Sequence, residues 1–349
     1  MTKLTTEQRA MAERNVLPKG AWSQRVRERS VGFLAGFDEV VSKGFADGRV
    51  QLPAFPDTRD LGIFSDYGGD HRASPVLTYS FLIVDFGVLD GFGRAMAQIR
   101  SEHKLGTREI SFKELSSKDV SAAVPRIMRA ADMLPGLLFT LAVNKRATSV
   151  VGHDRAIADA RKQLDEASIL SWRTQFELES AIRKVFTVAY WFAMLARDGM
   201  GLFWMTDNDN LVANQRGMDD LRKLLPAALD NVKSPSFRLI GLATEFARTK
   251  TEQPYFNDCL AVADLAAGSV AAAYTDLAKV KHHSEKKTPA IADVLTLHGH
   301  QGVFLKKLIV GVNEIDGELD LRPMWIDGTT RPRDGYFSYE SSSELNLEG

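Results

Sequence analysis

The chain has 349 residues, 44% of them hydrophobic, which is enough to bury one large core or one core with a smaller appendage. Its 44 Lys and Arg residues nearly balance its 45 Asp and Glu residues, so a protein that coats DNA through overall positive charge is not expected. The single cysteine, Cys259, excludes an intramolecular disulfide framework and a thiolate-based structural zinc site.

The first residues, MTKLTTEQRAMAERN, lack the apolar segment of a signal peptide. No run of roughly 18 apolar residues occurs that could span a bilayer. With a single cysteine suited to a reducing compartment, these features predict a cytoplasmic protein that neither enters nor crosses a membrane.

An amphipathic helix is predicted over residues 21–43, where apolar side chains recur near helical spacing. These side chains are Trp22, Val26, Phe33, Phe37, Val40 and Val41. A connector rich in Gly and Pro follows at 44–60. We expect residues 1–58 to form an N-terminal helical extension and linker.

The segment LGIFSDYGGDHRASPVLTYSFLIVDF, residues 61–86, predicts two neighbouring antiparallel strands. The first strand ends at Asp66, and Gly68 and Gly69 break the chain before the second strand at 76–88. A helix is expected at 90–106, opened by Asp90.

The sequence REISFKEL, residues 108–115, predicts a short strand or an extended lead-in to a helix that runs to about Leu134. Strands follow at 134–145, 201–210 and 236–244, and helical segments at 153–198, 211–232 and 254–280. The helix at 211–232 should kink or stop near Pro226. This alternation predicts a mixed α/β sheet with crossover helices.

The last regular element expected is a hairpin over 306–327 with Asp316 and Gly317 at its turn. The polar tail after it should be mobile. The expected division is a core at 59–285 with a helical insertion at about 151–198, a C-terminal helix and hairpin at 286–330, and a flexible tail at 331–349.

Three acidic residues occupy positions that bring them to one edge of the sheet. Asp66 and Asp207 end strands, and Asp264 lies in the helix of small residues that follows the strand at 236–244. Divalent cations relieve the repulsion between such carboxylates, and hard oxygen ligands suit Mg²⁺ or Mn²⁺. Two ions about 4 Å apart could activate water and stabilise the leaving oxygen of a phosphodiester.

Each acid also has a simpler interpretation. Asp66 could cap a turn, and Asp207 could belong to a hydrogen-bonded loop in the sequence DNDN. No such simple interpretation suits Asp264, because its helix is expected to be buried and an unpaired buried carboxylate costs several kcal/mol of folding free energy. Asn257 is expected to be the N-cap of that helix, and Asp258 to favour the same helix end.

Several other residues could contact a substrate. His71, five residues after Asp66, could orient water or phosphate. Lys113 could bind a phosphate, although a solvated surface lysine is the commoner case. Further contacts to a nucleic-acid backbone could come from Arg72, Arg216 and the basic run at 279–287.

Other chemistries lack their motifs. No HExxH helix, GxxxxGK[ST] loop or GxSxG elbow is present, and the lone Cys259 has no cysteine-protease context.

Three segments, in this order, resemble the bacterial domain-of-unknown-function 3800 family. FSDYGGD is similar to an opening Asp-Glu-Ser-Gly signature, EISFKEL to a middle Glu-Ile-His-like segment, and NDCLAVADLAAG to a closing Ala-Asp-Leu-Ile-Ala-Gly helix. The resemblance covers roughly residues 60–280 and implies a ribonuclease H-like fold. Its most specific piece is ADLAAG.

The resemblance implies that Asp66, Glu109, Asp207 and Asp264 are metal ligands. Tyr67 stands where the family usually has Glu, and Ser111 stands where His is common, so one ligand or proton-transfer group is missing from the pattern. The residues that could substitute or assist are Asp70, Glu114, His71, Lys113 and Asp209. Glu109 could instead pair with Arg108 or Lys113 at the surface.

These observations predict a Mg²⁺- or Mn²⁺-dependent nuclease with water as nucleophile, and the family analogy suggests a role in defence against phage or mobile elements. The alternative is an inactive ribonuclease H-like module that binds nucleic acid or protein. DNA and RNA are both open as partners, as are partner proteins and a homo-oligomer.

Overall fold

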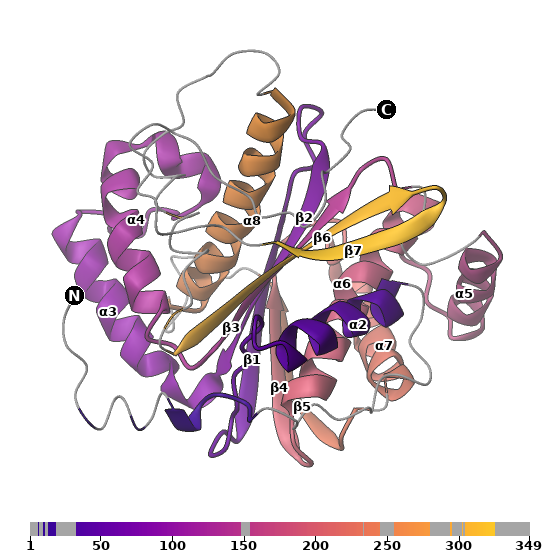
Figure 1. Ribbon diagram of the computed structural model, residues 1–349, viewed down its shortest axis with the longest axis horizontal. Helices are drawn as coiled ribbons and strands as arrows, with labels where there is room; N and C mark the ends of the chain where they lie inside the picture. The colour runs from indigo at the N-terminus through magenta and orange to yellow at the C-terminus, as the bar shows by residue number, and fades with distance from the viewer. Residues whose placement is uncertain are drawn as a thin grey trace.

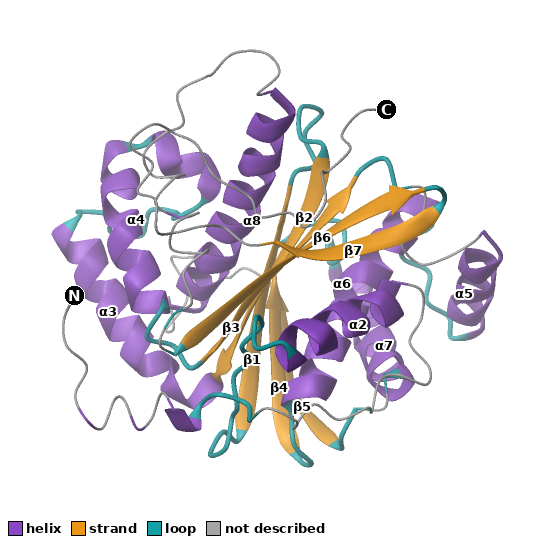
Figure 2. Cartoon of the chain, viewed as in Figure 1, coloured by secondary structure: helices purple, strands orange, loops and turns teal. Residues whose placement is uncertain are grey.

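The computed structural model describes residues 6, 10, 13–18, 33–147, 154–232, 234–244, 255–279, 294, 302 and 304–324. Within them a seven-stranded sheet has the order β5-β4-β1-β2-β3-β6-β7. Helices cover both faces of this sheet, as Figures 1 and 2 show. The expectation of an α/β fold with a mixed sheet and flanking helices is therefore confirmed.

The strands are β1 (Asp60–Gly68), β2 (Val76–Asp85), β3 (Gly136–Asn144), β4 (Met200–Thr206), β5 (Phe237–Thr244), β6 (Leu305–Ile315) and β7 (Glu318–Met324). The α-helices are α2 (Phe33–Ala46), α3 (Leu89–Glu102), α4 (Lys118–Ala131), α5 (Asp154–Glu166), α6 (Gln175–Leu195), α7 (Gln215–Asn231) and α8 (Tyr255–Lys279). Two 3₁₀ turns are η2 (Phe86–Val88) and η3 (Phe112–Ser116).

Strand directions bring several carboxyl ends to the same edge of the sheet. β1 and β2 are antiparallel, as predicted, and so are β2 and β3. β4 runs parallel to β1, β5 parallel to β4, and β6 parallel to β3. The segments that follow β1 and β4 therefore leave the sheet side by side.

The larger hydrophobic core lies between the sheet and helices α2, α6 and α7. Phe37 of α2 contacts the rings of Phe139, Tyr190 and Trp191 at centroid distances of 5.1, 4.8 and 5.6 Å. α2 therefore belongs to the core, although residues 21–31 of the predicted helix lie outside the described part. The helical insertion expected at 151–198 likewise contains α6, whose buried side chains cover this face.

The other face is covered by α3, α4 and α8, whose apolar side chains form a second core. Arg100 of α3 forms a buried ion pair with Asp258 of α8, and this pair joins the two helices. The segment Tyr255–Thr275 is long and apolar enough to cross a membrane, but 89% of that stretch is buried inside the protein. Burial of this kind is typical of the core helix of a soluble protein.

REISFKEL was expected to be a short strand or an extended lead-in to a helix, and the second alternative occurs: extended backbone at Ser111 leads into η3 and then α4. Two other local predictions differ from the structure. α7 does not stop near Pro226 but continues to Asn231, because the carbonyl that loses its hydrogen bond belongs to the exposed Arg222, where water can replace the bond. Asn257 is not the N-cap of α8, since the helix has already begun at Tyr255.

The C-terminal hairpin was predicted at its observed position. Asp316 and Gly317 both have positive φ angles, 53° and 81°, between β6 and β7. Positive φ at two central residues is the geometry of a type I′ hairpin turn, which Asp-Gly favours. The tail at 331–349, which was predicted to be mobile, and most of the basic run at 279–287 lie outside the described residues.

Candidate functional site

Asp66 and Asp207 lie beside each other where β1 and β4 approach their carboxyl ends. Ser65 pairs with Thr206 across these parallel strands, and the backbone N–H of Asp207 donates to the carbonyl of Ser65 at 3.0 Å. Asp66 is only 8% exposed. Side chains alternate along a strand, so Asp66 shares the face of Phe64, which packs in the core beneath α8.

Asp264 approaches the same place from α8, which crosses β1 and β2. The Thr78 hydroxyl of β2 donates to the Ala267 carbonyl of α8 at 3.0 Å, which fixes this helix close to the sheet. The Asp264 carboxylate accepts a hydrogen bond from the backbone N–H of Phe112. The loop that carries Glu109 is thereby tied to the helix that carries Asp264.

The acids raise one another's pKa values. Burial raises the pKa of Asp66 well above its usual range, and the charges of Asp264, Asp207 and Asp209 raise it further. Burial, with the charges of Asp207 and Glu109, raises the pKa of Asp264 to about 6. Burial and Asp209 raise the pKa of Asp207. Asp66, Asp207 and Asp264 thus lie within electrostatic reach of one another, and Glu109 lies within reach of Asp264.

Lys113 contributes positive charge to this cluster. It is exposed at the start of η3, and its charge lowers the pKa values of both Asp207 and Asp264. The neighbouring Glu109 is also exposed. Lys113 therefore lies near the half-buried Asp207 and Asp264, where its charge would attract an incoming phosphate.

The three carboxylates are chemically suitable ligands for a divalent cation, but they are not close enough together in the structure to hold one. Asp66, Asp207 and Asp264 offer hard oxygen ligands, and their hydrogen bonds within the described residues come from the backbone N–H groups of Tyr67, Asn208 and Phe112. In the described part of the chain, however, no group of three or more His, Cys, Asp or Glu is drawn together closely enough to hold a metal ion.

The predicted accessory residues have different surroundings. His71 is exposed in the turn after β1, and its carbonyl accepts from Lys145 at 2.8 Å. Glu114 pairs with Arg108 at 3.1 Å, so that pairing replaces the one considered between Arg108 and Glu109. Neither His71 nor Glu114 is joined to the buried acids by a contact among the described residues.

Asp209 faces a buried lysine that the sequence reasoning missed. Lys184 of α6 has a side chain only 4% exposed, and its ammonium group pairs with the Asp209 carboxylate. The same ammonium lies 3.9 Å from the centroid of the Tyr67 ring. The available signal was a charged group, Glu179, Arg183 and Lys184, inside the otherwise apolar helix at 175–195.

Tyr67, which stands where the resembled family usually has Glu, lies on the opposite face of the sheet from Asp66. Its hydroxyl bonds to Ser65 and Thr206 hydroxyls, each at 2.9 Å, and its ring packs on the α6 side of the sheet. Asp66 faces the α8 side, so residue 67 does not share the face of the buried acids. Ser111 stands where the resembled family commonly has His, and its buried hydroxyl has no hydrogen-bond partner among the described residues.

Comparison of the chain with protein-family models, curated proteins and solved structures gives no match in any of the three. These comparisons therefore do not show to which family the chain belongs or which known structures share its fold.

Proposed function

We propose that this protein is a Mg²⁺- or Mn²⁺-dependent nuclease that hydrolyses phosphodiester bonds at the edge where β1, β4 and α8 meet. The observation that carries the proposal is the burial of Asp66 beside Asp207 and Asp264, where the three charges repel. Within the described residues none of these three carboxylates forms an ion pair with Lys or Arg. Such a cluster needs protons or cations to be stable.

Different side chains of the protein would bind the metal ions and the phosphate. Asp66, Asp207, Asp264 and Glu109 would hold two divalent ions, which when bound polarise a phosphoryl oxygen and lower the pKa of a water molecule. Lys113 would attract the phosphate beside Asp207 and Asp264. The carboxylates would have to draw closer than they are in the structure for two ions to be held.

The finer fold and identity are part of the same proposal. Three antiparallel strands extended by parallel strands on the β1 side, with α8 across them, support a ribonuclease H-like core. We extend the proposal to membership of the bacterial family named above, to a cytoplasmic location and to nucleic acid as substrate.

Metal binding is the first test. Mn²⁺ should raise the melting temperature of the wild type, because a ligand that binds only the folded state stabilises it. Asp66→Asn and Asp264→Asn should lose this shift and also lose Mn²⁺-dependent nicking of DNA or RNA. The control is Asp57→Asn, at an exposed loop carboxylate. A wild type that neither binds Mn²⁺ nor cleaves either nucleic acid contradicts the proposal.

A catalytically inactive binding module is the second candidate. Two observations favour it: the lack of a compact ligand group within the described residues, and Ser111 in place of the family's His. Nucleic-acid binding that persists in the wild type without any cleavage in Mn²⁺ would select this candidate.

A further inference from the structure

A cavity of about 380 Å³ lies between α5 and the segment that leads into α6. It is lined by Arg161, Asp165, Leu170 and Arg173, of which two are cationic and one is anionic. The net charge of these lining residues is positive, whereas the chain as a whole has a formal charge of −1, and the charge of Arg161 also acts on Glu177. The cavity is therefore a local site for an anionic group.

Backbone carbonyls orient both arginines of this cavity. Arg161 donates to the carbonyl of Trp172, and Arg173 Nε donates to the carbonyl of Leu170 at 3.3 Å. A guanidinium carries five N–H donors, so each side chain is held in place while donors remain for a ligand. Arginine held in this way suits a phosphate group, which it can bind through two parallel hydrogen bonds.

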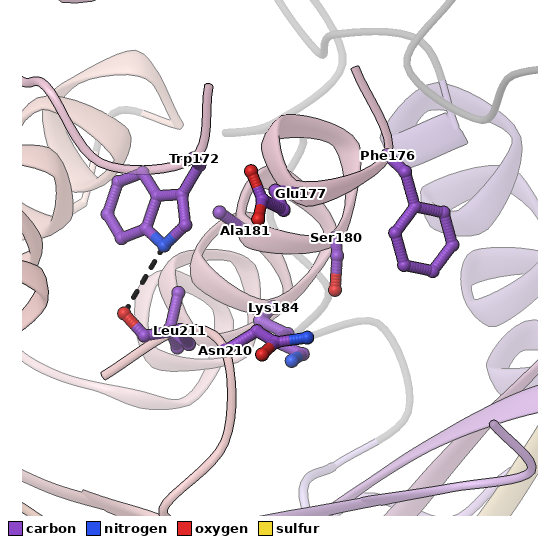
Figure 3. A pocket seen from close by; sticks show the side chains of 8 residues that line it. All are labelled: Trp172, Phe176, Glu177, Ser180, Ala181, Lys184, Asn210 and Leu211. Atoms are coloured by element: carbon purple, nitrogen blue, oxygen red, sulfur yellow. Dashed lines mark hydrogen bonds between the residues drawn. The ribbon is translucent and has the colours of Figure 1, made fainter. Parts of the chain in front are cut away.

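A small hollow at the first turns of α6 shares the segment 170–173 with the cavity: Leu170 and Arg173 line the cavity, and Trp172, whose carbonyl accepts from Arg161, lines the hollow. Figure 3 shows its lining residues: Trp172, Phe176, Glu177, Ser180, Ala181, Lys184, Asn210 and Leu211. The Phe176 side chain stands at one side of it and is 62% exposed. The Trp172 indole is fixed at the other side by a 3.2 Å hydrogen bond to the Leu211 carbonyl.

The hollow in turn borders the cluster of acids. Lys184, which lines the hollow, pairs with Asp209, the neighbour of Asn210 in the chain. The charge of Asp209 raises the pKa values of Asp66 and Asp207. The segment 170–173 therefore connects the arginine cavity to the hollow, and the loop after β4, through Asp209 and Asn210, connects the hollow to the acids on the other face of the sheet.

We propose that this surface binds a single-stranded segment of the nucleic-acid substrate. One phosphate would occupy the cavity of Arg161 and Arg173, and an adjacent base would stack on Phe176. The Ser180 hydroxyl and the exposed Asn210 amide could bond the edge of that base. The inference rests on the proposed function and gives it a substrate class, since a base can stack on a side chain only when it is unpaired.

Two acidic groups shape this surface as well. Asp165 lines the cavity together with the two arginines, and its negative charge offsets one of their positive charges. The remaining charge suits one anion rather than several. Glu177 is occupied by the N-cap of α6, where its carboxylate accepts from the backbone N–H of Thr174 at 3.0 Å. The phosphate would therefore sit against the guanidinium groups, and the base would lie at the Phe176 end.

The test is fluorescence anisotropy of a labelled single-stranded oligonucleotide, and of the same sequence as a duplex, in EDTA so that no cleavage occurs. Phe176→Ala should weaken single-strand binding about fivefold or more, the lower end of the range for one stacked base. The pair Arg161→Gln and Arg173→Gln should reduce the salt dependence by the equivalent of about one phosphate contact. Lys at both positions should largely retain that dependence.

The matched control is the pair Arg94→Gln and Arg129→Gln, at exposed residues of α3 and α4 on the opposite face of the sheet. Unchanged single-strand affinity in the Phe176 and arginine variants overturns the inference, as does an equal loss for single strand and duplex. Failure of the nuclease proposal appears elsewhere, as a wild type that shows no Mn²⁺-dependent hydrolysis of bis(p-nitrophenyl) phosphate.

Discussion

Asp264 is the residue whose charge state couples stability most directly to the candidate site. Its pKa is raised to about 6 by burial and by Asp207 and Glu109. The unfolded chain has a pKa of about 3.9 for Asp, so the folded protein binds this proton more tightly. The stabilising contribution of the proton is complete below about pH 4 and is lost as pH rises through about 6.

Asp264→Asn should therefore stabilise the metal-free protein at high pH only. We expect the free energy of unfolding at pH 8 to rise by on the order of 2 kcal/mol, with little change at pH 4. Urea unfolding in EDTA at several pH values measures this difference. The exposed Asp57→Asn should show no such dependence, and a pH-independent effect of Asp264→Asn would contradict the prediction.

Lys184 is the second residue with a predictable effect, because its removal leaves Asp209 without its cation. Lys184→Met should destabilise the fold by on the order of 2 kcal/mol, less than for a fully buried pair because Asp209 is 24% exposed. Denaturant unfolding measures the loss.

Adding Asp209→Asn to the Lys184→Met variant should recover part of that stability, which a double-mutant cycle quantifies. The control is Lys162→Met, since Lys162 forms only an exposed pair with Glu166. Additive effects of Lys184→Met and Asp209→Asn would show that the two groups do not interact.

Among the elements, the contact between α8 and η3 depends on one glycine. A methyl group at Gly268 would lie 2.1 Å from the Phe112 ring, far inside van der Waals contact. Phe112 also donates the backbone hydrogen bond to Asp264. Gly268 therefore controls how closely the loop of Glu109 approaches the helix of Asp264.

Gly268→Ala should cost about 1 to 3 kcal/mol in stability, as overpacking does, and thermal unfolding should reveal it. Phe112→Ala in the same chain should relieve the clash in part. Gly91→Ala in α3 is the matched control, since its methyl group would meet only the Arg94 guanidinium at 4.0 Å. Equal stability of Gly268→Ala and wild type would contradict the structure at this contact.

Elements with a strong local pattern were predictable from the sequence. The β1 and β2 pair, β4 and the Asp-Gly hairpin each carry apolar alternation or turn residues that few other structures accept. Whether the helix would continue through Pro226 was not predictable, because this depends on which face of α7 is exposed. For REISFKEL the sequence left a strand and an extended lead-in as alternatives, because its backbone is shaped by a hydrogen bond to a helix about 150 residues later.

The candidate site was predictable only in outline. Strand ends and helix order placed Asp66, Asp207 and Asp264 at one edge, but no pattern revealed that Lys184 reaches Asp209 from the other face. Nor could periodicity show that α2 is a core helix, because its partners are distant in sequence, whereas the density of apolar residues in α6 did indicate a core helix. Charges inside an apolar helix were the one signal that could have indicated Lys184.

At the scale of the whole molecule, the sheet is completed late in the chain. β3 is buried along almost its whole length, and its parallel neighbour β6 begins at Leu305. A chain that stops at residue 304 should therefore expose an apolar strand edge and aggregate, which light scattering would detect. A chain that stops at Met324 retains every described strand and should remain monodisperse. Equal behaviour of the two would contradict this prediction.

The composition of α8 has a consequence for the newly made chain. While β6 and β7 are still being synthesised, a ribosome presents a 21-residue segment apolar enough for insertion into lipid. Asp264 lies one residue from its midpoint, where an acid opposes translocon-mediated insertion by about 3 kcal/mol. The Asp264 carboxylate would thus also help to keep this helix in water until it packs on β1 and β2.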